Sequence, residues 1–599
     1  MGFFRFLFRL LVGLLALVGL VVVGAVGTGF WLYRDFAAFE RPEAPRGATV
    51  LLLDTFSGFA ERRSDSAFAA LSDDAPVLRE VVAALDAAAE DDNVKGLVAR
   101  VGLGPLGLTQ VQELRLALAR FRASGKFAIA HSETFGEGGD GILHYYLASA
   151  FDEVWLQPSG LVDATGFSLK KPFLGEALAE LDIVARVAQR KEAKGAASFL
   201  TERRMPQAER ENLGLLVDAW LAQFVTGVGE DRELAPDAVR AQIDRGPLLA
   251  KEALEAELID RLAYWDEAEE EGLARAGDEA EYYDLGAYAR DVAEASDWKR
   301  PEDGATVALL HGLGAIVIDG NEDDGLLPDS GVLSAGELAD TIAEAAADPE
   351  VDAILLRIDS PGGSYVGSDR IWREVARAVE DGMPVVVSMG EVAASGGYFV
   401  AAPASKIVAL PGTVTGSIGT VSGKLVLSDF WRNYGIAWDG VSAGAQADFW
   451  SMNQDFDEAG WARLNATLDA VYADFIGKVA QGRKLSPEAV EAVAKGQVWS
   501  GRDALERGLV DALGGWAEAI DLARAEADFP AGAQVILKPF PPPRDLWESV
   551  IADLGRLPGL YGEKTRLARA LAPLLRVLAP LVSEVERSDR LRLESPLPR

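Results

Sequence analysis

The sequence predicts an α/β protein built as a tandem duplication and preceded by one membrane-spanning helix. Short apolar runs alternate with helical stretches along the 599 residues, a pattern typical of buried parallel strands covered by helices. Several segments recur at an offset of about 255 residues, which is the signature of an internal repeat. An uncharged run at 10–33 precedes the first repeat.

The uncharged run is long enough to cross a bilayer. As a helix with a rise of ~1.5 Å per residue it spans about 36 Å, against ~30 Å of hydrocarbon. Arg5 and Arg9 precede it, whereas the charges of Arg34 and Asp35 nearly cancel. The positive-inside rule therefore predicts a cytoplasmic N-terminus, with the rest of the chain on the extracytoplasmic, periplasmic side of the inner (cytoplasmic) membrane.

A cleaved signal peptide is the alternative interpretation of this run, with 25–27 as a loose cleavage site. The apolar region of a signal peptide is usually ~7–15 residues long, so the length favours a permanent anchor. The predicted segments are a cytoplasmic N-terminus at 1–9, a transmembrane helix at 10–33, a linker at 34–48, an N-terminal repeat at 49–265, an acidic connector at 266–305, a C-terminal repeat at 306–540 and a helical tail at 541–599.

The duplication is visible in three pairs of segments. Both members of each pair combine an apolar run with similar flanking residues, which predicts equivalent strands and helices in the two halves. The pairs are Thr49–Asp54 with Thr306–His311, Asp92–Arg100 with Pro349–Arg357, and Glu252–Asp260 with Asp503–Asp511.

Composition excludes several classes of function. The formal net charge is −35, from 58 basic and 93 acidic residues, and nucleic-acid binding needs cations that displace phosphate counterions. The absence of cysteine excludes thiol catalysis, disulfides and cysteine-ligated metals. Only three histidines are present, which argues against a histidine-rich metal site and against a Ser/His/Asp triad.

The residues with the strongest chemical signal lie in the C-terminal half. Ser395 follows a predicted strand and begins a predicted helix, within Gly390–Tyr398. At a helix N-terminus the free N–H groups and the dipole stabilise developing negative charge. Asp359–Gly363 also follows a predicted strand, and its glycine N–H groups can approach a substrate carbonyl closely. Ser417 lies in a third segment of small residues, 411–419.

Taken singly, each of these motifs is more often a tight turn or a close-packed helix start. Together, in this order, they resemble the signal peptide peptidase A family, also called protease IV, in its long duplicated form with an N-terminal anchor. The match covers nearly the whole chain after residue 48. The motifs that carry it are Asp359–Gly363, Ala394–Tyr398, Thr415–Gly419, Val498–Gly501 and Gly508–Asp511.

The resemblance implies a ClpP/crotonase-like α/β fold in each half and a Ser–Lys dyad shared between the halves. The sequence is consistent with such a split site. Aligning the repeats places Ser395 opposite Ile142, so the N-terminal half lacks the nucleophile. The lysine-bearing segment 186–202 lies opposite 440–449, which contains no lysine. Each half therefore retains one component of a single composite site.

Two lysines compete for the role of base. In the family, the lysine is followed by a small residue and alanine, then by Phe and Thr-Glu, and Lys194 with Phe199–Glu202 fits this pattern. Lys191 is the alternative base. A lysine amine must be desolvated to accept a proton near neutral pH, because its pKa in water is ~10.4.

The resemblance further implies that Ser417 orients the lysine and that the N–H of Gly396, with that of Gly362 or Gly363, forms the oxyanion hole. No cofactor or metal is expected. The expected activity is endopeptidase cleavage of signal-peptide remnants and other extended apolar peptides by a membrane-anchored homotetramer. Two alternatives remain: a membrane scaffold whose dyad has decayed, and a crotonase relative that processes acyl-CoA.

Overall fold

The computed structural model describes residues 45, 47–63, 75–102, 104–139, 141–295, 304–319 and 331–542. The expected transmembrane helix at 10–33 lies outside these residues, as does almost all of the expected tail at 541–599. Among the residues that are described, no helix combines the length and the apolar character needed to cross a membrane.

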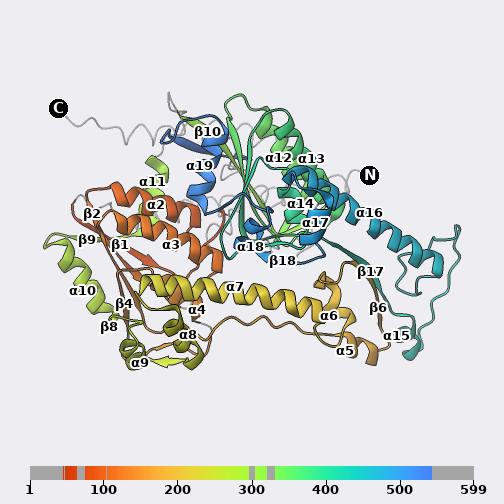
Figure 1. Ribbon diagram of the computed structural model, residues 1–599, viewed down its shortest axis with the longest axis horizontal. Coiled ribbons are helices and arrows are strands. Elements are labelled where there is room, and N and C mark those ends of the chain that lie inside the picture. The colour runs from red at the N-terminus through yellow and green to blue at the C-terminus, as the bar shows by residue number, and fades with distance from the viewer. Residues whose placement is uncertain are drawn as a thin grey trace, which may run out of the picture.

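The N-terminal half is built on a parallel six-stranded sheet in the order β8-β4-β3-β2-β1-β9. One face is covered by α2, α3, α4 and α11, and the other by α10 (Figure 1). The bounds are β1 Thr49–Asp54, α2 Leu78–Glu90, β2 Val94–Arg100, α3 Leu108–Ala123, β3 Phe127–Ser132, α4 Ile142–Ala148, β4 Glu153–Leu156, β8 Arg261–Leu262, α10 Trp265–Ala276, β9 Glu281–Asp284 and α11 Leu285–Ala295.

The C-terminal half repeats this plan in a larger sheet of order β18-β16-β14-β13-β10-β20, in which β15 pairs with β14 and β19. All of its pairings are parallel except that of β16 with β18. The bounds are β10 Ala305–Leu313, α12 Ala335–Ala347, β13 Ala353–Ser360, α13 Tyr365–Glu380, β14 Val385–Ala394, α14 Gly396–Ala401, β15 Lys406–Ala409, β16 Val414–Gly416, α16 Glu458–Arg483, α17 Pro487–Val493, β18 Val498–Ser500, α18 Gly501–Glu506, β19 Ala512–Leu513, α19 Trp516–Glu526 and β20 Val535–Pro539.

One pair of buried tyrosines shows that the two halves are equivalent in detail. Tyr145 on α4 donates a hydrogen bond from its hydroxyl to the carbonyl of Leu258 at 2.8 Å. Tyr398 on α14 donates to the carbonyl of Leu509 at 2.9 Å. The same side chain thus makes the same tertiary contact in both sheets, and it fixes the alignment of the repeats.

The prediction that 266–305 is a connector is wrong over most of that range. The acidic residues at its start belong to α10, whose inner face packs Ala268 and Gly272 against the sheet while Asp266 and Glu267 face solvent. The next strand, β9, then pairs in parallel with β1. The N-terminal domain therefore continues to the end of α11, because these elements complete its sheet and its helical layer.

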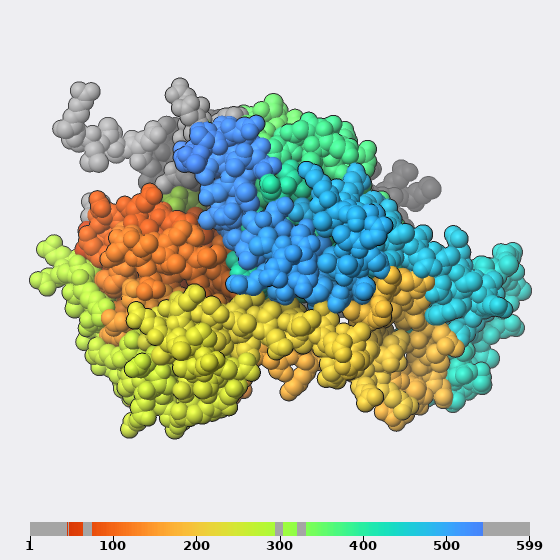
Figure 2. Space-filling view, viewed as in Figure 1, coloured from red at the N-terminus to blue at the C-terminus, as the bar shows by residue number. Residues whose placement is uncertain are grey.

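Segments from the two halves interlock beside the C-terminal sheet. Strand β6, Val184–Arg190, belongs to the N-terminal half and pairs antiparallel with β17, Thr420–Val426, of the C-terminal half. Helix α7, Gln207–Asp231, runs from this pairing back to the N-terminal sheet (Figure 1), and its surface lies against the C-terminal residues in Figure 2. The remaining short elements are β5 Leu161–Val162, α5 Gly175–Glu180, the 3-10 turn η2 Gly195–Ala197, α6 Ser198–Thr201, α8 Pro236–Arg245, β7 Leu248–Leu249, α9 Ala250–Glu255, β11 Ala315–Val317, β12 Val332–Ser334 and α15 Ser428–Asn433.

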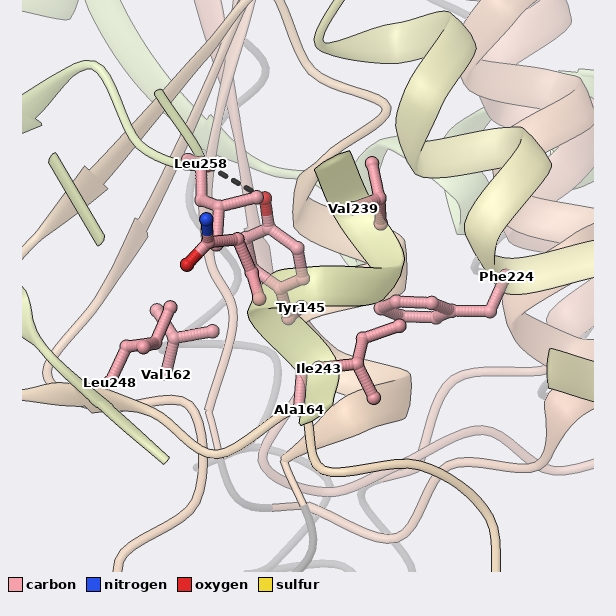
Figure 3. A pocket seen from close by; sticks show the side chains of 9 residues that line it. Tyr145, Val162, Ala164, Phe224, Val239, Ile243, Leu248 and Leu258 are labelled. Carbon is pink, nitrogen blue, oxygen red and sulfur yellow. Dashed lines mark hydrogen bonds between the residues drawn. The ribbon is translucent and has the colours of Figure 1, made fainter. Parts of the chain in front are cut away.

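A small apolar cavity lies in the N-terminal half, beneath the buried face of α4 (Figure 3). Tyr145 and Phe224 line it with aliphatic side chains that include Val239, Ile243 and Leu248. None of its lining residues belongs to the sequence-predicted site, so the cavity is a packing feature of this half.

Candidate active site

Ser395 occupies a sharp turn between a strand and a helix. Strand β14 ends at Ala394, α14 begins at Gly396, and Ser395 between them has φ 54° and ψ −117°. A positive φ in a residue with a side chain costs of order 1–3 kcal/mol and persists where the surroundings enforce it. Here the Ser395 N–H donates to Gly416 O at 2.9 Å and its carbonyl accepts from Phe399 N at 2.9 Å.

Lys194 of the N-terminal half reaches Ser395 of the C-terminal half. Its Nζ lies 2.9 Å from Ser395 Oγ, 2.9 Å from Ser417 Oγ and 2.7 Å from the Ser417 carbonyl oxygen. The three residues that the sequence predicted as nucleophile, base and orienting serine therefore meet at one point, although the first two are separated by 201 positions in the chain.

The side chain of Lys194 is almost completely shielded from solvent. The residue is only 4% exposed, and burial lowers the pKa of its amine from 10.5 to about 8. Two glycines make room for its stem: a Cβ on Gly419 would lie 3.1 Å from Lys194 Cδ, and a Cβ on Gly496 would lie 2.6 Å from Lys194 Cβ. Desolvation causes this shift of the pKa, because burial penalises the charged form of the amine.

Backbone hydrogen bonds hold Ser417 in place. It has φ 51°, and its N–H donates to Gln497 O at 2.6 Å. Gly496 N donates to Ile418 O at 2.8 Å, which fastens the same segment to the turn before β18. Both oxygens of Ser417 are consequently directed at the lysine amine.

The predicted amide donors converge beside Ser395. Gly396 is the first residue of α14, where the N–H has no acceptor within the helix. A Cβ on Gly362, which has φ 95°, would lie 2.4 Å from Gly396 N, and a Cβ on Gly396 would lie 3.1 Å from Gly363 N. Only glycine permits this approach, so the amides of Gly396 and Gly363 lie close to each other and to the serine.

Lys191, the alternative base, is engaged elsewhere. Its Nζ forms an ion pair with Glu491 on α17 and lies 5.2 Å from the centre of the Tyr472 ring. No hydrogen bond joins it to Ser395 in the part of the chain that the structure describes. The geometry therefore separates the two candidate lysines, with Lys194 at the serine.

The three histidines all lie within the described residues, and none of them hydrogen-bonds to Ser395 or Lys194. His131 Nε2 lies 3.1 Å from Ala263 O, and His144 Nε2 lies 2.8 Å from Gly104 O. His311 lies beside Trp516, with 6.3 Å between the ring centres, and desolvation lowers its pKa to about 3. Across the described ranges, no group of three or more His, Asp or Glu side chains is arranged to hold a metal ion.

Sequence reasoning missed the residues that support the lysine turn. Lys171, Ser198 and Glu209 form a hydrogen-bonded cluster under Gly195, the residue after Lys194. Nothing in the local sequence marks these side chains, because Lys171 lies in a loop, Ser198 on α6 and Glu209 on α7. Gly496 was missed for the same reason.

Comparison with known proteins identifies the family. The model of peptidase family S49 matches residues 123–277 and again residues 377–529, once in each half of the duplication. The chain belongs to peptidase family S49. This family of serine proteases thus accounts for both halves of the chain, as the predicted resemblance implied.

Relatives with curated descriptions match most of this S49 chain. Protease 4 of Salmonella typhi is 32% identical over 546 residues, covering 87% of this chain and 85% of the relative. The chloroplastic serine protease SPPA of Arabidopsis thaliana is 29% identical and covers 78% of this chain and 68% of the relative. Protease 4 of Haemophilus influenzae is 28% identical and covers 74% and 72% respectively.

Proposed function

We propose that this S49 protein is a membrane-anchored serine endopeptidase in which Ser395 is the nucleophile and Lys194 the general base. The observation that carries the proposal is the 2.9 Å contact between the buried Lys194 amine and Ser395 Oγ. A nucleophile and a base within hydrogen-bond reach, with the base oriented by a third group, is the arrangement that activates a serine. Ser417 is that third group.

The hydrogen-bond geometry suits a neutral amine. A neutral amine has two N–H groups and one lone pair. Ser417 offers two acceptors, its carbonyl oxygen and its Oγ, which leaves the lone pair free to accept the proton of Ser395. In the proposed reaction, Lys194 takes this proton as Oγ attacks the substrate carbonyl, then returns it to the leaving amine. Water hydrolyses the acyl-enzyme by the reverse sequence.

The Gly396 and Gly363 amides are proposed as the oxyanion hole. Preorganised N–H donors contribute most where charge develops in the transition state, and loss of one typically costs ~10²–10³-fold in rate. Gly362 supports this role through its left-handed backbone, which turns the 362–363 peptide towards α14.

The proposed substrates are extended apolar peptides, including signal-peptide remnants left in the membrane. The proposed location is the inner membrane, with residues 10–33 as a single-pass anchor and the catalytic part outside the cytoplasm. These assignments rest on the uncharged run, on the flanking arginines and on the resemblance to signal peptide peptidase A.

Hydrolysis measured against pH tests the proposed chemistry. For the detergent-solubilised full chain and a leucine- and alanine-rich fluorogenic peptide, we expect kcat/KM to rise about tenfold per pH unit and to level off near pH 8. The sign follows from the base: the Lys194 amine acts only when deprotonated, and burial sets its pKa to about 8. An active enzyme that levels off near 6.5 would point to a histidine base, and a parent inactive at every pH would favour a scaffold.

We also propose that the protein is a homotetramer, because the duplication leaves one strand-pairing segment without a partner strand in each half of the described chain. The alignment of Tyr145 with Tyr398 places residues 437–443 opposite β6. Residues 168–173 lie between Gly166 and α5, as β17 lies between Gly416 and α15. Within the described residues neither segment pairs with a strand. A β6–β17-like pairing between chains is a heterologous contact, and such contacts form a ring when the rotation from one subunit to the next closes. The number four comes from the family resemblance.

Sedimentation of the detergent-solubilised protein tests this assembly. The parent is expected to sediment as a tetramer, and Val441→Pro as smaller species. Val441 is fully exposed within the chain, and proline removes a backbone donor from the open segment. Lys170→Met, a change on the surface of the other segment that leaves the backbone intact, serves as the control. A parent that is purely monomeric contradicts the proposal.

A further inference from the structure

We propose that Lys171 and Glu209 are positioning residues that hold the Lys194 amine on Ser395. This inference rests on the proposed function, in which Lys194 is the base. It assigns a task to two charged side chains that lie outside the reacting groups and that no sequence motif marks. The carboxylate of Glu209 is almost entirely buried, at 5% exposure of the residue.

The pair encloses the turn that follows the lysine. The Gly195 carbonyl accepts a hydrogen bond from Lys171 Nζ at 3.0 Å, and Lys171 Nζ also donates to Ser198 Oγ at 2.7 Å. Glu209 in turn accepts from Ser198 Oγ at 2.7 Å and forms an ion pair with Lys171. The peptide next to Lys194 is therefore held by a closed set of charge-assisted hydrogen bonds, which are stronger than neutral ones.

Close packing adds a steric restraint to these bonds. A Cβ on Gly195 would lie 2.3 Å from Glu209 Cδ, so the backbone of the turn rests directly on the carboxylate. Lys194 itself lies against Gly496, where a Cβ would come within 2.5 Å of Lys194 N. The lysine turn is therefore in close contact both with Glu209 of α7 and with the turn before β18.

Helix α7 connects this restraint to the other half of the site. One turn after Glu209, Asn212 accepts from Val498 N at 2.8 Å and donates to Val498 O at 2.9 Å. Val498 begins β18, which pairs with β16, and the Ser417 N–H bonds to Gln497 just before it. The first turns of α7 therefore hold the lysine turn and the serine-bearing sheet in one fixed relation.

The test compares steady-state kinetics of full-length variants. Lys171→Met is expected to lower kcat about 10–100-fold with KM within about twofold, because a base displaced by ~1 Å loses about that much rate while the peptide site is unchanged. Lys171→Arg is expected to recover most of the loss, since it restores the cation. Lys251→Met, a change at an exposed lysine of α9 outside both strand-pairing segments, is the matched control and should behave as the parent.

The ion pair between Lys171 and Glu209 leads to a second, independent prediction. Glu209→Gln combined with Lys171→Met should lose less kcat than Lys171→Met alone, because the single variant leaves a buried carboxylate without its cation. Ser198→Ala, which removes the hydroxyl between Lys171 and Glu209 and no charge, is expected to lower kcat several-fold at constant KM and serves if Lys171→Met does not fold.

Several results would overturn the inference. Parent-like kcat in Lys171→Met and Ser198→Ala would do so, as would a loss confined to KM or a loss not recovered by arginine. Sedimentation of each variant separates a change in assembly from a change in the turn. The proposed function fails by a different result, namely undiminished hydrolysis in Ser395→Ala or Lys194→Met, so the two failures are distinguishable.

Discussion

Replacing Lys194 with methionine is expected to abolish peptide hydrolysis and, below pH 8, to make the folded chain more stable. Methionine fills the buried channel of the lysine stem but cannot accept the Ser395 proton. A positioned general base contributes ~10²–10⁴-fold to rate, so we expect kcat/KM to fall by about 10³-fold or more. Hydrolysis of the fluorogenic peptide at pH 8 measures this loss.

The expected gain in stability follows from the direction of the pKa shift. The Lys194 amine has a lower pKa in the folded chain, about 8, than in the unfolded chain, 10.5. The unfolded state therefore binds the proton more tightly between these values, and burying the charged amine destabilises the fold fully below pH 8. Removing the amine should stabilise the chain by about 1–3 kcal/mol there, with the gain vanishing towards pH 10.5. Chemical denaturation at pH 7 and at pH 10 measures both limits.

Lys191→Met is the matched control for the Lys194 variant. Lys191 is three positions away, but its ion pair with Glu491 is partly exposed, and such pairs contribute ~0–1 kcal/mol. Activity within a few-fold of the parent is expected. If Lys191→Met is inactive and Lys194→Met is active, the base is Lys191 and the geometry of the dyad is contradicted.

The duplicated α/β architecture could be predicted because buried parallel strands leave a local signal. Thr49–Asp54 and Thr306–His311 are apolar runs at equivalent places, and both lie in strands that are paired on both sides, next to the edge strand of their sheets. The boundary after the first repeat could not be predicted in the same way. The acidic residues of α10 resemble a solvated connector, and only tertiary packing reveals that Ala268 and Gly272 face a sheet.

The contacts between the two halves could not be predicted from the sequence. Glu391, on the strand that leads to Ser395, accepts hydrogen bonds from the N–H groups of Leu108 and Thr109 at the start of α3. A carboxylate at a helix N-terminus is favourable, but here the two partners are more than 280 positions apart. The pairing of β6 with β17 is equally non-local. Such contacts depend on how two domains dock, which no local pattern encodes.

The residues of the site also fall into two groups, those that local motifs predict and those that only the fold brings together. Ser395, Ser417 and the glycines lie in short motifs within one half, and the order of these motifs together with the family resemblance marked them. Lys194 could be chosen over Lys191 from the residues that follow it, but the contact with Ser395 could not be derived. Lys171 and Glu209 could not be predicted from the sequence. A single lysine or a single glutamate is an ordinary surface residue, and only the fold brings these two together.

Replacing Ser395 with alanine is expected to lower kcat by about 10⁴-fold or more while leaving the fold and peptide binding intact. The variant removes one hydroxyl and keeps the Cβ, so the strained turn with φ 54° is no worse for alanine than for serine. The Lys194 amine keeps both of its contacts to Ser417. Loss of the nucleophile of a cooperating set removes nearly all of the catalysis that the set provides.

The same variant decides between an enzyme and a scaffold. A scaffold whose dyad has decayed would be indifferent to the loss of one buried hydroxyl, and Ser395→Ala would then match the parent in every assay. Ser417→Ala gives a graded comparison: it removes one of two acceptors that orient the lysine, so a loss of about 10–100-fold is expected, smaller than that of Ser395→Ala. If Ser417→Ala is the more damaging change, then the hydroxyl that attacks is not that of Ser395. The order of the two losses, measured with one peptide at pH 8, therefore assigns the nucleophile.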